Sequence, residues 1–138
     1  MSYHASEDPL ITRAAEYYGV DPLFMIAIRQ HENGESGREF GVLSIPAPRY
    51  IDQLTTCCAS VRNHLTLYVG AVHRNVTRPG ASRRLAYARE FIAHFGYKWC
   101  PVGADNDPKH LNENWIPRVT DFYEALVKDS AASGLQEA

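Results

Sequence analysis

The chain has 138 residues, of which 45% are hydrophobic and 22% are charged, and its formal net charge at pH 7 is -2. This length fits one domain with a core of its own, and the composition is that of an ordinary globular protein rather than a disordered chain. The nearly balanced charge excludes binding to nucleic acid through overall positive charge, and no apolar run reaches the length of a membrane span.

Two helices with the same start signal open the chain. Each begins with an Asp-Pro pair, at residues 8–9 and 21–22, which supplies an N-cap and then a proline in the first turn. Gly19 is expected to end the first helix and Gly34 the second. Apolar residues surround the second helix on nearly every side, so we expect residues 21–33 to form the buried central helix.

Helical spacing of apolar residues predicts three more helices, over about residues 48–67, 82–95 and 112–128. Between them, the segments 69–81 and 96–111 contain Gly, Pro, Asn and Asp residues that are typical of loops. Five helices are therefore expected.

The predicted fold class is all-α, with at most a vestigial short β element near residues 40–43. We expect a single helical domain over residues 1–128. Residues 129–138 lack apolar periodicity and are expected to fray.

The three cysteines, Cys57, Cys58 and Cys100, are an odd number and two of them are adjacent, so we expect reduced and mostly buried thiols. The six histidines show no paired ligand spacing, so no metal site and no cofactor are expected. The Asp-Asn-Asp run at residues 105–107 lacks the glycine and glutamate of a calcium loop and is interpreted as a turn or a helix cap.

Positive charge gathers in the middle of the chain. Residues 38–89 contain eight arginines and only two acidic residues, Glu39 and Asp52. Such a segment can face an anionic polymer, either nucleic acid or cell wall, or it can simply form a solvated face.

Glu32 is the most informative residue, because it ends the apolar helix two residues before Gly34. A carboxyl group half out of water has its charged form disfavoured, so it can act as an acid near neutral pH. The structural alternative is a helix-end carboxylate that is solvated or caps a neighbouring group. Three glycines in the segment 34–41 allow tight turns and a close approach of the backbone to a ligand.

Residues 14–33, which include the sequence Gly-Val-Asp-Pro and end in Glu32 and Asn33, resemble the opening of the bacterial lytic transglycosylase and goose-type lysozyme family. The resemblance implies that Glu32 is the catalytic acid, with Asn33 in the place of a serine that usually follows it. The Phe-Gly-Val segment that contains Gly41 and Val42 is also similar to bacterial endo-β-N-acetylglucosaminidases, which share the lysozyme-like fold.

A second segment, residues 113–123, resembles the last helix of the transglycosylases. Trp115 stands where that family has a tyrosine that lines the cleft near the catalytic acid. A tryptophan can stack on a sugar ring and donate from its indole nitrogen. The two segments together imply a single lysozyme-like domain.

The resemblance implies cleavage of a β-1,4 glycosidic bond of peptidoglycan, with Glu32 as general acid and base. Possible second carboxylates are Glu35, Glu39 and Asp52; if none of them reaches the sugar, Glu32 acting alone fits a transglycosylase. The expected partners are glycan strands, without nucleic acid or a membrane span, and the chain is expected to be a monomer. The substrate-binding candidates are Asn33, Glu35, Glu39, Gly41, Val42, Trp99, Asn114 and Trp115.

Two other interpretations stay open. One is a non-catalytic, lysozyme-like module that binds the cell wall, and the other is a helix-turn-helix DNA-binding protein. The first four residues have neither a basic start nor an apolar run, so a secretory signal is not expected. We therefore expect synthesis in the cytoplasm and access to the wall as a phage or prophage enzyme, a virion component or a secreted effector.

Overall fold

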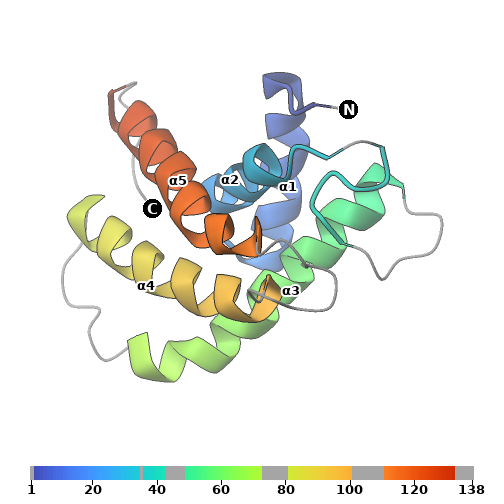
Figure 1. Ribbon diagram of the computed structural model, residues 1–138. Helices are drawn as coiled ribbons and strands as arrows, with labels where there is room; N and C mark the ends of the chain where they lie inside the picture. Colours follow the sequence, from blue (N-terminus) through green and yellow to red (C-terminus); the bar gives the residue numbers. More distant parts are fainter. Residues whose placement is uncertain (1, 35, 43–48, 73–80, 101–110, 133–138) are drawn as a thin grey trace. The chain divides into compact units, whose positions relative to one another are not determined.

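The computed structural model describes residues 2–34, 36–42, 49–72, 81–100 and 111–132, with the exception of the side chains of residues 66–72, 81–88, 111, 131 and 132. In this part of the chain, all regular structure is helical, which confirms the all-α prediction. Figure 1 shows the elements in chain order: η1 (Ala5–Glu7), α1 (Asp8–Tyr18), α2 (Pro22–Glu32), α3 (Tyr50–Val72), α4 (Ala81–Trp99), η3 (Leu111–Asn114) and α5 (Trp115–Ala132).

The chain divides into two compact units, Met1–His64 and Leu65–Ala138, and the boundary falls within α3. The residues of the predicted β element that are described, 40–42, lie in a turn and an irregular loop rather than in a strand. Leu43, the last residue of that predicted element, lies outside the described residues.

In the first unit, α1 packs against α2. The N-cap of α1 is Glu7 rather than Asp8, because a short 3-10 turn, η1, precedes the helix and has its own capping box between His4 and Glu7. Gly19 ends α1 in the left-handed conformation, with φ of 71°, as predicted.

The start of α2 also agrees with the prediction. Asp21 caps it, since the Asp21 Oδ1 atom accepts a hydrogen bond of 2.9 Å from the backbone N–H of Leu23. Six consecutive residues, 24–29, are buried, which is what a helix apolar on nearly every side requires. The C-cap is Asn33 rather than Gly34, because asparagine tolerates the left-handed φ of 43° that ends the helix.

In the second unit, α4 packs against α5. Gly96 marks the closest approach: a Cβ atom there would lie 2.6 Å from Cγ1 of Ile116 and 2.7 Å from Cε3 of Trp115. The rings of Phe95 and Trp115 lie 5.8 Å apart, and Arg89 on α4 forms an ion pair with Glu124 on α5. A glycine inside the helix therefore permits close packing rather than ending the helix.

The helices are longer than predicted at several ends. The predicted loop 69–81 begins with helical residues up to Val72, and α4 continues to Trp99 through the start of the predicted loop 96–111. Helix α5 includes the first four residues of the predicted frayed tail, and residues 133–138 lie outside the described part. None of the described helices combines the length and apolarity that crossing a bilayer requires.

Candidate active site

Glu32 is the last residue of α2, and its side chain is half-buried. The helix is fixed in position because residues 24–29 are packed into the core. The carboxyl group also lies at the C-terminal end of a helix, where the partial negative charge of the last carbonyls disfavours a carboxylate. The first unit therefore places the acidic side chain of Glu32 at the edge of its core.

Gly41 lies against the carboxyl group of Glu32. A Cβ atom built on Gly41 would lie 2.6 Å from Oε1, 2.7 Å from Cδ and 3.1 Å from Oε2 of Glu32. The φ angle of Gly41 is 74°, which favours glycine on its own account. A glycine therefore stands at the position where a side chain would clash with the carboxyl group of Glu32.

Gln53 holds the loop around Gly41. Its Oε1 atom accepts hydrogen bonds of 3.1 Å from the backbone N–H groups of Phe40 and of Val42, and its Nε2 atom donates to the carbonyl of Val42 at 2.7 Å. The side chain is fully buried at the start of α3. One amide therefore satisfies three backbone groups of a buried loop, as a neighbouring strand would.

Glu39 holds the chain just before this loop. Its side chain is 3% exposed, and its Oε1 atom accepts a hydrogen bond of 3.0 Å from the backbone N–H of Gly37. The next turn is closed by a bond of 3.1 Å from the N–H of Gly41 to the carbonyl of Arg38. The carboxylate of Glu39 thus organises its own loop.

A buried ion pair ties the same loop to α2. Arg29 is 1% exposed, and its guanidinium contacts both carboxylate oxygens of Glu7, at 2.8 and 3.3 Å, and the carbonyl of Glu39 at 3.4 Å. The hydroxyl of Tyr50 donates to Glu7 at 2.7 Å. Burial opposes the charge of Glu7, but the hydrogen bonds from Arg29 and Tyr50 outweigh it, so the pKa of Glu7 lies below its ordinary value.

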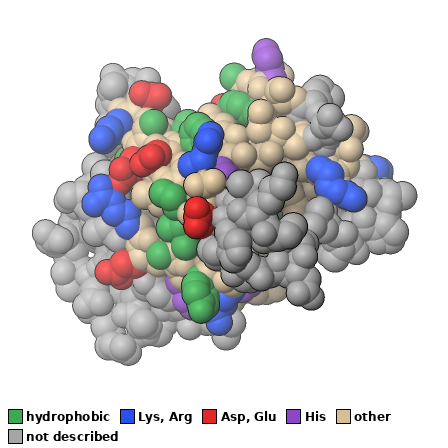
Figure 2. All heavy atoms as spheres, viewed as in Figure 1, with side chains coloured by type: hydrophobic (Ala, Val, Ile, Leu, Met, Phe, Trp, Pro, Cys, Tyr) green, Lys and Arg blue, Asp and Glu red, His purple; other side chains and the backbone are tan. Residues whose placement is uncertain are grey.

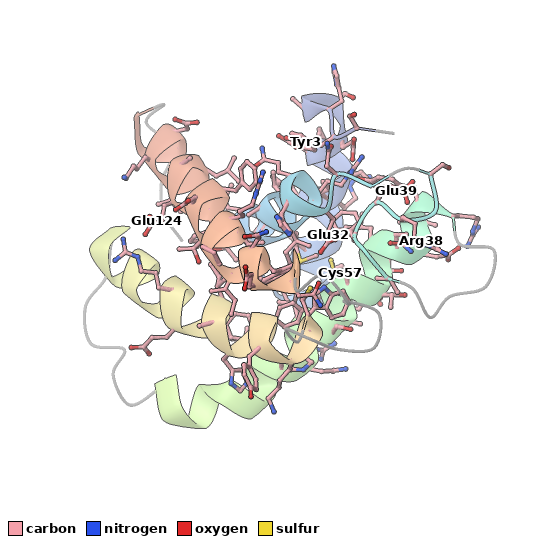
Figure 3. All side chains as sticks on the ribbon, in the orientation of Figure 1. Tyr3, Glu32, Arg38, Glu39, Cys57 and Glu124 are labelled. Carbon is pink, nitrogen blue, oxygen red and sulfur yellow. The ribbon has the colours of Figure 1, made fainter. Side chains whose placement is uncertain are left out.

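Cys57 lies near Glu32 on the α3 side, as Figure 3 shows. The side chain is fully buried, and burial raises the pKa of its thiol, followed by the charges of Cys58 and Glu32. All three cysteines are free, with Cys57 and Cys58 buried and Cys100 half-buried. A neutral thiol thus forms part of the surroundings of Glu32.

The other predicted residues of the first unit that the structure describes are buried or bonded to a neighbour. The Oδ1 atom of exposed Asn33 accepts a hydrogen bond of 2.7 Å from the backbone N–H of Tyr3. Val42 is buried, and Asp52 pairs with Arg49 at 2.9 Å. Glu35 lies outside the described residues.

The predicted aromatic residues belong to the second unit. Trp115 is only 1% exposed and packs beside Phe95 and Gly96, so its ring has no face open for a sugar. Trp99 is half-buried and stacks on Phe95, with 5.2 Å between ring centroids, whereas Asn114 is exposed at the end of η3. That these residues share a site with Glu32 stays a prediction.

Arginine charge is partly neutralised in the described part of the predicted basic segment. Arg49 pairs with Asp52 and Arg89 with Glu124. On the face shown in Figure 2, described basic side chains are interspersed with acidic ones. Arg38 and Arg62 are exposed, and the side chains of the other four arginines, between residues 74 and 84, lie outside the described part.

Neither Gln53 nor the pair Glu7–Arg29 was predicted from the sequence. A glutamine in the first turn of an apolar helix carries no signal that it will bond to a loop 11 residues earlier. Arg29 offered a weak signal, since it is a charged residue inside a helix predicted to be buried, and such a charge requires a partner.

Comparison with known proteins gives no match for this chain, whether among family models, curated proteins or solved structures.

Proposed function

We propose that this protein cleaves β-1,4 glycosidic bonds of peptidoglycan, with Glu32 as the general acid and base. The observation that carries the proposal is the placement of the Glu32 carboxyl group. It is half-buried at the end of a buried helix and faces the α-carbon of Gly41, in a loop held by Gln53. A carboxyl group held in position beside a residue without a side chain can approach a glycosidic oxygen.

The reaction requires a proton on the leaving oxygen and stabilisation of an oxocarbenium-like sugar. Glu32 supplies the proton and then, as a carboxylate, accepts one from the incoming nucleophile. Of the described candidates for a second carboxylate, Glu39 is buried and bonded to Gly37, and Asp52 is paired with Arg49. Their engagement favours a mechanism in which one carboxyl group serves both steps.

Such a single-carboxyl mechanism needs a nucleophile from the substrate itself. The hydroxyl group at C6 of muramic acid can close a 1,6-anhydro ring, and Glu32 would accept its proton. We therefore favour a lytic transglycosylase over a hydrolase. The partner is a glycan strand, and the place of action is the cell wall, reached by phage or prophage release, within a virion or by secretion.

The test is mass spectrometry of the fragments that the protein releases from purified peptidoglycan. The proposal predicts muropeptides with 1,6-anhydro ends. Reducing muramic or glucosamine ends would retain the glycosidase and replace the transglycosylase mechanism by hydrolysis. Binding to the wall without any soluble fragment would leave only a wall-binding module, and salt-dependent retention on DNA without wall cleavage would favour the helix-turn-helix alternative.

A further inference from the structure

We propose that Gln53 is a positioning residue for catalysis, which sets the location of the Glu32 carboxyl group through the backbone of the Phe40–Val42 loop. The inference rests on the proposed function for its effect on turnover. Its structural part rests on bonds within the first unit alone. The side-chain hydrogen bonds of Gln53 go to the backbone of Phe40 and Val42, so its action on Glu32 passes through Gly41.

The clamp consists of the three side-chain hydrogen bonds between Gln53 and the backbone of Phe40 and Val42. The three hydrogen bonds of Gln53 fix the N–H groups of Phe40 and Val42 and the carbonyl of Val42, on both sides of Gly41. With these groups held, the Gly41 residue between them has little freedom to move. Its α-carbon consequently stays against the Glu32 carboxyl group.

Gln53 shares a buried face of α3 with Cys57. Gln53 and Cys57 are one turn apart on α3, and both are fully buried. Cys57 lies near Glu32, and Gln53 holds the loop that contacts Glu32. The same face of α3 therefore fixes two parts of the surroundings of Glu32, its thiol neighbour and its glycine neighbour.

The clamp depends on the amide group of Gln53. The clamp needs an acceptor for two N–H groups and a donor for one carbonyl on the same planar group, and a neutral amide provides both. A carboxylate of the same shape keeps the acceptor but loses the donor, and it then faces the Val42 carbonyl with like partial charge. A protonated carboxyl group restores the donor. In the Gln53→Glu variant, the hydrogen bond to the Val42 carbonyl should therefore form where the introduced carboxyl group is protonated and be lost where it is ionised.

The experiment measures kcat and KM for wall cleavage against pH in the wild type, Gln53→Glu and Gln53→Met. Because misplacement by about 1 Å can cost about 100-fold in rate, we expect kcat of Gln53→Glu to fall by about 10- to 100-fold at neutral pH, with KM nearly unchanged. Its kcat relative to wild type should recover as the introduced carboxyl group is protonated. Gln53→Met, which lacks both donor and acceptor, should show the loss without the recovery.

A measurement without turnover separates this inference from the proposed function. The NMR titration midpoint of the Glu32 carboxyl group should differ between the wild type and Gln53→Met, and the N–H groups of Phe40 and Val42 should exchange faster in the variant. A shifted midpoint in a protein that cleaves no wall would retain the positioning role and reject the glycosidase. A folded Gln53→Met protein with unchanged midpoint and kcat would overturn the inference, whether or not the wild type cleaves the wall. If Gln53→Met does not fold, Gln53→Glu at acidic and neutral pH supplies the same comparison, and an unchanged Glu32 midpoint and relative kcat across that range would overturn it.

Discussion

The carboxyl group of Glu32 and the α-carbon of Gly41 form a contact that leaves no room for a side chain. A Cβ atom on Gly41 would lie 2.6 Å from the nearer carboxylate oxygen, well inside ordinary van der Waals contact. The glycine thus has two separate requirements to meet, a left-handed φ of 74° and the absence of a side chain. The two requirements can be tested separately, because another glycine of the same unit has only the first.

We expect Gly41→Ala to lower the rate of wall cleavage by at least about 10-fold, because the added methyl group displaces the Glu32 carboxyl from its position. The left-handed φ should add about 1 kcal/mol of destabilisation. The rate on purified peptidoglycan and the free energy of unfolding in urea measure the two effects.

Gly19→Ala is the matched control. Gly19 has a φ of 71°, and a Cβ atom there would meet nothing within 4 Å. The two variants should therefore share the backbone cost, and only Gly41→Ala should lose activity. Equal activity of the two variants would show that the contact with Glu32 has no part in turnover.

The pair Glu7–Arg29 makes the first unit sensitive to acid. The pKa of folded Glu7 lies below its ordinary value of 4.5, so its stabilising effect is present above that value and is lost as the pH falls through the folded pKa. We expect Glu7→Gln to cost about 3 kcal/mol at pH 7, because it leaves the Arg29 charge buried without its ionic partner. The variant should then lose less further stability than wild type on acidification.

Urea unfolding at a series of pH values measures this difference, and Glu16→Gln is the control because Glu16 is exposed on α1. Ordinary carboxyl groups titrate between about pH 5 and 3. If the wild type and Glu7→Gln lost stability in parallel over this range, the account would be contradicted.

Gly96→Ala should destabilise the second unit. In an open helix, replacing glycine by alanine stabilises by about 1 kcal/mol. Here the methyl group meets Ile116 and Trp115 at 2.6 and 2.7 Å, so overpacking should reverse the sign and give a net loss of about 2 kcal/mol. Thermal unfolding followed by tryptophan fluorescence measures it, and a stabilised Gly96→Ala protein would contradict the close approach of α4 and α5.

Thiol reactivity tests the surroundings of Glu32 on α3. Burial raises the pKa of Cys57, and it raises the pKa of Cys58 to about 12, so little thiolate is present in the native protein at pH 8. We expect an alkylating reagent to modify half-buried Cys100 at least about 10-fold faster than either residue, and all three equally in denaturant. Peptide mapping by mass spectrometry measures the order, and rapid modification of native Cys57 would contradict its burial beside Glu32.

Local signals predicted the helices well. The start of α2 at Asp21-Pro22 and the end of α1 at Gly19 follow from capping chemistry alone. The continuous apolar surface of α2 predicted its burial. The helix ends were less accurate where a tertiary contact overrides a local signal. Gly96 resembles a helix stop in the sequence, yet it lies inside α4 because α5 packs against it.

The candidate site was predicted only in part. The position of Glu32 at the end of a buried helix follows from periodicity, whereas its contact with Gly41 depends on a loop whose path is set by Gln53. Glu39 was expected as a loop carboxylate and is buried, because the loop folds back so that its carboxylate accepts the Gly37 N–H. Such bonds between side chains and backbone leave no periodic trace in a sequence.

The most direct test of the account is the rate of wall cleavage by Glu32→Gln. The amide has the size of the carboxyl group and cannot supply the proton, so the rate should fall by at least about 100-fold. Unfolding and circular dichroism should match the wild type, and Glu16→Gln should cleave at the wild-type rate. A Glu32→Gln protein that releases muropeptides within about twofold of the wild-type rate would contradict the assignment of Glu32 as the catalytic acid.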